Sequence, residues 1–369
     1  MTKLNYTREE ILAQHEYTTK FTHKGETLHG GLTADGLYCP PRSLNRIDAI
    51  ENWTDVLRKE GHDIEIMDRE KINKDHEFFP SVEQTKLLLK NGCKDSMTRI
   101  LTIIGVVEGF GNDGIKLLPA MDLQKHFVES IEGTCLAHIH DGLLTAHGND
   151  EAGFGDELGH DSMWYAIRDR ALGNPTITDD MFENLPLAPP PGYKGKAKAA
   201  KSVQKMQIGN ITKQTFPQLD LMLELTLGAL ARILNIEYAA YPTFRWAQNV
   251  LSDPDASASP QWASKMVAYI QADEDIHVNY LRCALAETKA RTLIARDGSH
   301  VSGAEVVDKF CEMAMEEFGG PRRDKMMAFR FKQITNELDQ HPDGERILRE
   351  FKALGPVPEL DKEKRAASA

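Results

Sequence analysis

Residues 219–253 read LDLMLELTLGALARILNIEYAAYPTFRWAQNVLSD, and residues 261–290 read QWASKMVAYIQADEDIHVNYLRCALAETKA. Both segments repeat apolar residues at the three- and four-residue spacing of a helix with one buried face. Glu237 interrupts that face in the first segment, and Glu274 and His277 interrupt it in the second. A carboxylate that points into a core is costly unless a cation meets it there. The two segments therefore predict a helical hairpin around a buried cation.

The spacing of these residues suits an antiparallel pair of helices. Glu237 and Glu274 lie 37 residues apart, and the loop at 252–260 falls close to midway between them. Two antiparallel helices would bring the two carboxylates to similar heights. A Glu-x-x-His pair that faces a lone Glu on the preceding helix supplies half the ligands of a two-metal site in a four-helix bundle. The alternative is an internal Glu274–His277 polar pair on a solvent-facing helix.

An earlier part of the chain repeats the pattern. Glu157 and His160 form a second Glu-x-x-His, and Glu132 in SIEGTCL matches Glu237 in NIEYAAY. The segment 121–147 reads as one helix that stops at Gly148–Asn149, and the next reads as a helix that ends at 173–175. Glu157 and His160 on a plain surface helix are the alternative to a second ligand pair.

The heights of this first hairpin do not match. With a turn at Gly148–Asn149, Glu132 lies sixteen residues before the turn and Glu157 eight after it, a difference of roughly 12 Å at 1.5 Å per residue. Either the helix breaks earlier, at Asp141–Gly142, or the ligand is another residue of the same face, which carries Glu129, Glu132, His140 and His147. His140 has the matching height, so Glu132 and His140 remain alternatives, and any departure from the pattern is expected between residues 129 and 147.

The stretches ARILNIEYAAYPTF and ADEDIHVNYLRCALAE resemble the ferritin-like diiron-carboxylate superfamily, in which a Glu on one helix precedes a Glu-x-x-His helix. The resemblance implies an all-α fold, namely a ferritin-like four-helix bundle with additional N- and C-terminal helices. It also implies two metal ions, most often iron, with O2 as co-substrate. Carboxylates and imidazoles suit Fe or Mn, so Mn/Fe and Mn/Mn pairs remain alternatives to Fe/Fe. The ligands implied are Glu132, Glu157, His160, Glu237, Glu274 and His277.

Three further residues lie next to these ligands. Asp156 and Asp273 each precede the Glu of a Glu-x-x-His pair and are expected to accept the second N–H of a ligand histidine across helices. Tyr241 lies one turn beyond Glu237 and is the one catalytic candidate. It is a substrate contact, a redox-active phenol or a core residue.

Composition limits the partners and the compartment. The 369 residues carry 44 Lys and Arg against 56 Asp and Glu, a formal net charge of −12, which argues against nucleic-acid and anionic-membrane partners. The five cysteines form no C-x-x-C pair, which suits a reducing compartment. The N-terminus has no apolar signal region, and no run approaches the ~20 apolar residues of a membrane span. A soluble, cytoplasmic protein is expected.

The chain divides into three segments. Residues 1–79 lack a sustained period and read as an arm or cap, residues 80–297 as the bundle, and residues 298–369 as two helices and a frayed tail. A Pro- and Lys-rich stretch, residues 185–202, reads as an exposed linker between the halves of the bundle. The stretch 81–110 predicts a helix interrupted by Gly92, although its β-branched residues 100–107 allow a strand.

Two other patterns are set aside. Residues 109–114 spell G-x-G-x-x-G, but Pro119 follows within five residues, where a dinucleotide-binding turn requires an uninterrupted helix. His138-x-His140 is similar to a pair in metal-dependent hydrolases, yet its surroundings predict a helix and not a strand end.

Three functions compete: an O2-activating oxidase or oxygenase, an iron-handling ferroxidase, and a helical protein without metal. Because this chain adds long segments on both sides of the bundle, a substrate pocket and hence an oxygenase are favoured. The expected partners are a small-molecule substrate and an electron-donating reductase or ferredoxin. The sequence leaves the oligomeric state open, with a homodimer as one alternative.

Overall fold

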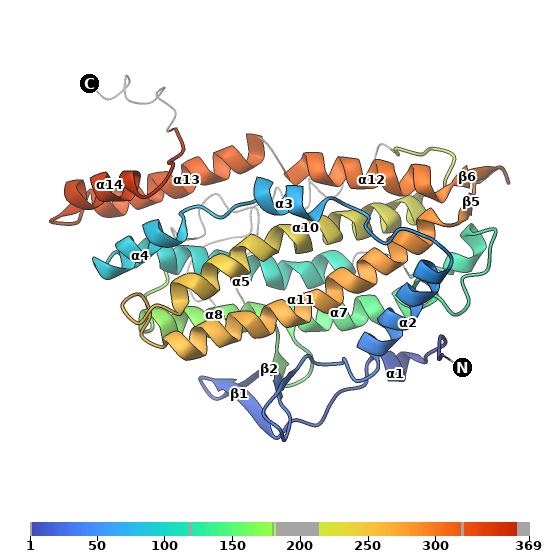
Figure 1. Cartoon of the computed structure of the whole chain (residues 1–369), viewed down its shortest axis with the longest axis horizontal. Coiled ribbons are helices and arrows are strands. Elements are labelled where there is room, and N and C mark those ends of the chain that lie inside the picture. Colours follow the sequence, from blue (N-terminus) through green and yellow to red (C-terminus); the bar gives the residue numbers. More distant parts are fainter. Residues whose placement is uncertain are drawn as a thin grey trace.

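The computed structural model describes residues 2–116, 118, 120–178, 181, 214–318 and 321–359. Helices dominate this part of the chain, which confirms the predicted all-α class (Figure 1). The linker predicted at 185–202 and the tail after residue 359 lie outside the described residues.

Helices α10 (Leu221–Leu251) and α11 (Pro260–Lys289) run antiparallel through the middle of the molecule (Figure 1). The Asp220 carboxylate caps α10 by accepting from two backbone N–H groups, and Pro260 opens α11, where a missing N–H has no cost. Glu237 lies fourteen residues before the end of α10, and Glu274 lies fourteen residues after the start of α11. The two carboxylates are therefore at the same level, as their spacing predicts.

Helix α5 (Asp95–Lys116) follows α4 (Val82–Lys90), and Gly92, at φ +81°, lies in the turn between them. The strand alternative for residues 100–107 is wrong, since these residues lie inside α5. Gly105 lets α5 approach α8 (His160–Leu172) closely, because a Cβ there would lie 2.5 Å from the ring of Tyr165.

The chain between α5 and α8 is more broken than predicted. A short 3-10 helix, η1 (Leu123–His126), is followed by α6 (Cys135–His138), the π-helical turn η2 (Ile139–Leu143) and α7 (Leu144–Ala152). Asp141 and Gly142 have non-helical backbone angles, so the helix does break there. The predicted stop at Gly148–Asn149 is wrong, because α7 continues to Ala152.

Between α7 and α8 the chain makes a short excursion that carries β4 (Glu157–Leu158). Its two ends touch: a Cβ on Gly159 would lie 2.4 Å from the backbone nitrogen of Gly153, an approach that only glycine allows. Phe154 and Glu157 exchange two backbone hydrogen bonds within it. Helix α8 therefore continues where α7 ends, and the two follow one line in Figure 1.

The N-terminal segment contains α1 (Arg8–Ile11), β1 (Thr19–His23), β2 (Glu26–Leu32), β3 (Tyr38–Cys39), α2 (Arg46–Lys59) and α3 (Arg69–Asp75). The three strands form an antiparallel sheet in the order β1-β2-β3. Strand β4 joins this sheet parallel to β2, with Thr27 opposite Glu157. The excursion between α7 and α8 is thus tied to the N-terminal sheet.

The C-terminal segment begins with a hairpin of β5 (Thr292–Ile294) and β6 (His300–Ser302). Helices α12 (Gly303–Phe318) and α13 (Pro321–Leu338) correspond to the two predicted helices, and α14 (Gly344–Ala353) was not predicted. Both α12 and α13 lie along one long side of the molecule (Figure 1).

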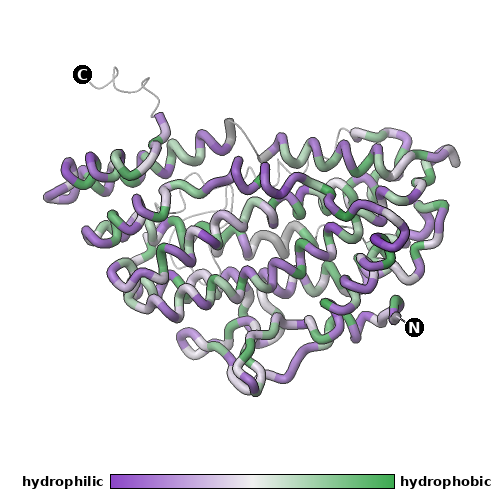
Figure 2. Tube along the Cα trace, viewed as in Figure 1, coloured by the Kyte–Doolittle hydropathy of each residue, from purple (hydrophilic) through white to green (hydrophobic). Residues whose placement is uncertain are grey.

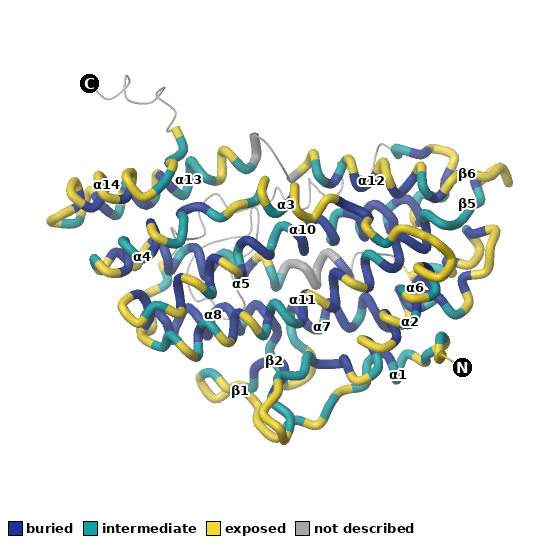
Figure 3. Tube along the Cα trace, in the orientation of Figure 1, coloured by how far each residue is buried: buried dark blue, intermediate teal, exposed yellow. Residues whose placement is uncertain are grey.

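The core joins all three predicted segments. Trp53, Leu234 and Val306 are at most 1% exposed and belong to one apolar cluster. Figure 2 shows apolar and polar residues alternating along the helices, and Figure 3 shows that the buried positions gather along the central ones. No helix in the described part of the chain is both long and apolar enough to cross a membrane.

Candidate metal centre

Among the described residues, seven acidic and histidine side chains converge between the central helices, and we call them the centre. They form two groups, and in each the potential ligand atoms all lie within 4.8 Å of one another. The His147 group contains His147, Glu151, Glu237 and His277. The His160 group contains Glu108, Glu151, His160 and Glu274. Glu151 belongs to both groups.

Five helices supply these side chains. Glu108 lies on α5, Glu237 on α10, and Glu274 and His277 on α11. His147 and Glu151 lie one turn apart on α7, and His160 is the first residue of α8. Residues separated by three or four positions share a helix face, so each of these pairs points inward together.

Two carboxylates connect the groups. Glu274 has one oxygen 3.0 Å from Nδ1 of His160 and the other 2.5 Å from Nδ1 of His277. Glu151 has Oε1 3.4 Å from Nε2 of His147 and Oε2 3.8 Å from Nδ1 of His160. Both carboxylates thus lie where a bridge between two metal ions would lie.

Three atoms of the His160 group are buried and have no hydrogen-bond partner in the described part of the chain: Oε2 of Glu151, Nδ1 of His160 and Oε1 of Glu274. Nδ1 of His160 and Oε1 of Glu274 are only 3.0 Å apart, yet they do not meet hydrogen-bond geometry. A buried polar atom without a partner calls for an explanation, and an ion is one. The lone pairs of these three atoms are directed toward a common point and not toward one another, as expected of atoms that bind a metal ion.

The excursion hides a second Glu-x-x-His pair. If residues 153–158 are left out, the chain reads Glu151-Ala152-Gly159-His160, which has the spacing of Glu274 and His277. Because Gly153 and Gly159 are in contact, α8 starts where α7 ends, and Glu151 and His160 lie as they would on one continuous helix. The first half of the centre therefore has the same pattern as the second half, interrupted by a loop.

The outer nitrogens of the histidines are also engaged. Nε2 of His160 lies 3.0 Å from Asp273, and Nε2 of His277 lies 3.0 Å from Asp150. An ionised carboxylate can only accept, so both histidines carry that proton outward and turn Nδ1 to the centre. Asp273 thus lies where its predicted role requires, whereas Asp156 is exposed in the excursion.

The N-terminal segment packs against these outer carboxylates. Asp150 accepts from Arg42 and from Arg46, the latter at 2.8 Å, and Asp273 accepts from the Tyr38 hydroxyl at 2.8 Å. Nε2 of His29 lies 3.5 Å from an oxygen of each Asp, at Asp150 and Asp273. The segment predicted as an arm or cap therefore covers the outer side of the centre.

The charge states of the carboxylates differ. Burial, together with the neighbouring Glu274, raises the pKa of Glu237 to about 7, and burial with Glu151 raises the pKa of Glu274 to about 7. Burial also raises the pKa of Glu108 well above its usual range. Burial acts the same way on Asp150, but Arg46 and Arg42 outweigh it and hold its pKa well below the usual range. Without cations the centre thus retains protons that metal ions would displace.

Four of the six predicted ligands are in the centre, and two are not. Glu132 is exposed just before Gly133, a turn residue at φ +72°. Glu157 lies on β4, where it forms a 2.8 Å ion pair with Lys20. These placements correct the prediction, because the excursion carries Glu157 off the helix axis. The rival ligand His140 also lies outside the centre, half-buried in η2.

The sequence pattern did not point to Glu108 or Glu151 as ligands, and His147 was one of the four residues on the face expected to supply the open ligand. One signal could have found Glu151: Asp150-Glu151 repeats the Asp-Glu pair of residues 273–274, with His147 one turn earlier. Glu108 interrupts the apolar run at the end of residues 100–107. Neither residue belongs to the expected pattern, in which a Glu on one uninterrupted helix is followed by a Glu-x-x-His pair on the next.

Tyr241 has the contacts of a core residue. It is 8% exposed, its hydroxyl donates to Asp275, and the Arg69 guanidinium lies 4.1 Å from its ring centroid. None of its hydrogen bonds or ring contacts in the described structure involves the centre.

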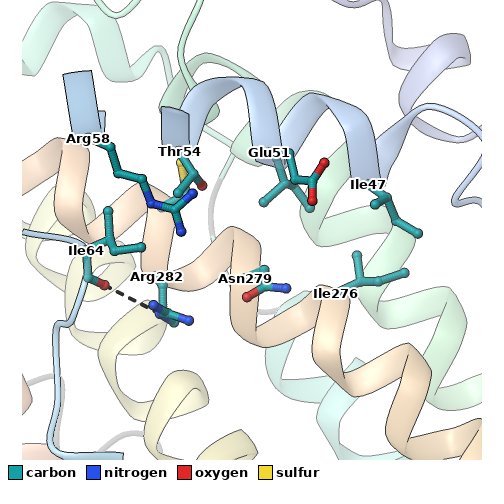
Figure 4. Close-up of a pocket in the computed structure, with 10 residues that line it drawn as sticks. Ile47, Glu51, Thr54, Arg58, Ile64, Ile276, Asn279 and Arg282 are labelled. Atoms are coloured by element: carbon teal, nitrogen blue, oxygen red, sulfur yellow. Dashed lines mark hydrogen bonds between the residues drawn. The ribbon is translucent and has the colours of Figure 1, made fainter. Parts of the chain in front are cut away.

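A surface pocket lies between α2 and α11 (Figure 4). Its lining includes Thr54 and Arg58 from α2 and Ile276, Asn279 and Arg282 from α11. At 100° per residue, positions 276 and 279 face away from positions 274 and 277. The pocket therefore lies on the side of α11 opposite the centre.

Comparison of this chain with protein-family models, with curated proteins and with solved structures finds no match.

Proposed function

We propose that this protein holds two metal ions in the centre and uses them to activate O2 for the oxidation of a small organic substrate. The observation that carries the proposal is the pair of four-residue groups that share Glu151 and are joined by Glu274. Two sites that share bridging carboxylates inside a helical bundle are typical of dinuclear carboxylate proteins.

The arrangement of helices supports the resemblance to the ferritin-like superfamily. Helices α5, α10 and α11 supply three positions of a four-helix bundle, and the α7–α8 line supplies the fourth. Each position contributes at least one acidic side chain of the centre. A ferritin-like bundle is therefore the architecture that we propose for this part of the chain.

The donor set fits iron or manganese. It contains four carboxylates and three imidazoles and no thiolate, a set that favours Fe and Mn over ions that prefer sulfur. When bound, two such ions supply electrons to O2. The three histidines would hold them through their inner nitrogens and the four carboxylates through their oxygens, and the buried side chains around the centre would exclude bulk water.

An organic substrate is favoured over simple iron handling by the elements outside the bundle. The N-terminal sheet and α2 cover the outer side of the centre, and α12 packs along α10 and α11. A ferroxidase needs little beyond the bundle. Since an oxygenase cycle consumes electrons, we expect a reductase or ferredoxin as partner.

The test begins with the metal. We expect two Fe(II) per chain under anaerobic loading, and near-ultraviolet absorption typical of a carboxylate-bridged ferric pair after exposure to O2. Glu274→Ala should lose stoichiometric binding, because both groups depend on this carboxylate. Glu157→Ala, which removes a predicted ligand outside the centre, should bind iron like the wild type.

The outcomes separate the candidates. Wild-type protein that takes up no more than trace metal would refute the proposal, as would Glu274→Ala with two tightly bound ions. Iron that accumulates far beyond two ions per chain would replace the oxygenase by an iron-handling ferroxidase.

A further inference from the structure

The three histidines of the centre have different outer partners. His160 and His277 contact the carboxylates of Asp273 and Asp150, but Nδ1 of His147 lies 2.8 Å from the hydroxyl of Tyr280. A carboxylate fixes the direction of the imidazole because it can only accept. A phenol fixes it only when its oxygen accepts the Nδ1 proton, which leaves the Nε2 lone pair free.

The surroundings of Tyr280 hold it in place for this role. Its side chain is fully buried, and His147 is its hydroxyl's one hydrogen-bond partner among the described residues. The ring of His147 stacks on that of His277, with centroids 3.7 Å apart. Stacking fixes the plane of the His147 ring, but it does not decide which nitrogen faces inward.

The inward nitrogen of His147 is Nε2. It lies 3.2 Å from Glu237 and 3.4 Å from Glu151, so it shares their point of convergence. If the ring turned over, Nε2 would leave the centre and the His147 group would lose one of its four ligands. The contact with Tyr280 is the one hydrogen bond that opposes this turn at Nδ1.

We infer that Tyr280 is a positioning residue for one half of the metal centre: its hydroxyl oxygen accepts the Nδ1 proton of His147 and presents Nε2 to the ion held with Glu237. The inference rests on the proposed function. It makes the two metal positions unequal, because among the described residues the Tyr280 hydroxyl bonds only to His147, whereas His160 is held by Asp273.

Mn(II) binding tests the inference, since paramagnetic resonance distinguishes one bound ion from a coupled pair. Tyr280→Phe should lower the affinity for one of the two Mn(II) ions by about 10- to 100-fold, which is the usual effect of losing the hydrogen-bond partner of a metal ligand. The affinity for the other Mn(II) ion should not change. Tyr238→Phe is the matched control, because Tyr238 is equally buried and its hydroxyl has no hydrogen-bond partner among the residues that the structure describes. It should bind two ions like the wild type.

A second pair of variants separates positioning from packing. His147→Gln should weaken the same ion, and adding Tyr280→Phe to it should cause no further loss, because Tyr280 acts through His147. The inference would be overturned if Tyr280→Phe bound both Mn(II) ions with wild-type affinity or lost affinity equally for both. It would also be overturned if Tyr280→Phe lowered the affinity as much in the His147→Gln background as in the wild type. Wild-type protein without Mn(II) or Fe(II) would instead overturn the proposed function.

Discussion

At the scale of single residues, the centre is defined by buried carboxylates that repel one another when no cation is bound. Burial raises the pKa of both Glu237 and Glu274, and a neighbouring carboxylate adds to it in each case: Glu274 for Glu237, and Glu151 for Glu274. Glu151 belongs to both groups of ligand atoms. A metal pair would replace the protons that now reduce this repulsion.

The stability of the metal-free protein should therefore depend on pH. Glu237 and Glu274 have a pKa of about 7 in the folded protein, against about 4.5 for a glutamate in the unfolded chain. Between these values the folded protein binds more protons than the unfolded chain, so the free energy of unfolding falls as pH rises from 4.5 to 7. Bound metal should remove this dependence, because the ligands are then ionised at both pH values.

Thermal unfolding of chelator-treated and Mn(II)-loaded protein between pH 5 and 7.5 checks this. The gain in Tm on metal loading should grow as pH rises. Glu287, whose pKa burial raises to about 7, affects both forms alike, so the difference reports on the centre. Parallel curves for the two forms would contradict the prediction.

At the scale of elements, the excursion between α7 and α8 decides where half of the ligands lie. Gly153 and Gly159 bring its ends together, and β4 ties it to β2. Without that contact, α8 would not start in line with α7, and the side chains of His160 and Glu151 would no longer lie close together.

Replacement of Gly159 by Ala tests this element. The new Cβ would lie 2.4 Å from the Gly153 nitrogen and 2.5 Å from the Glu151 carbonyl oxygen, so the backbone must move. We expect a clear fall in Tm and weaker binding of Mn(II), with His160 displaced.

Gly155→Ala in the same excursion is the control. Gly155 has nothing within 4 Å of a new Cβ, and its φ of +62° costs about 1–2 kcal/mol for a non-glycine residue. It should lower Tm modestly and leave Mn(II) binding intact. Equal metal affinity in the two variants would show that the glycine contact does not position the ligands.

At the scale of the whole molecule, the N-terminal segment and the bundle form one unit around the centre. Arg46, the first residue of α2, is fully buried and pairs with Asp150 at 2.8 Å. Asp150 in turn orients His277. A residue more than a hundred positions earlier in the sequence thus supports a ligand of the centre.

Arg46→Met should destabilise the protein by about 3–5 kcal/mol, since it leaves a buried charge with fewer partners. It should also weaken metal binding by about 10- to 100-fold, because Asp150 no longer holds His277 as firmly. Chemical denaturation and Mn(II) titration measure the two effects.

Arg58→Met on the same helix provides the comparison. The Arg58 side chain is 56% exposed and pairs with an exposed Asp55, so its loss should cost under about 1 kcal/mol. If both variants bind Mn(II) like the wild type, the N-terminal segment does not support the centre.

Local period and spacing in the sequence predict several parts of this structure. Helical periodicity predicts the α10–α11 hairpin, and equal distances from its loop place Glu237 and Glu274 at one level. The all-α class and the stop at Gly173 follow from the same kind of signal. These inferences succeed because each helix there runs without interruption.

The other half of the centre depends on contacts between segments that are distant in the sequence. Glu151 and His160 come together because a loop leaves the helix and returns, and no sequence spacing shows which residues such a loop removes. Glu108 lies in the His160 group of the centre because α5 packs closely on α8. Contacts between distant segments are set by packing of the whole chain, and a local pattern does not contain them.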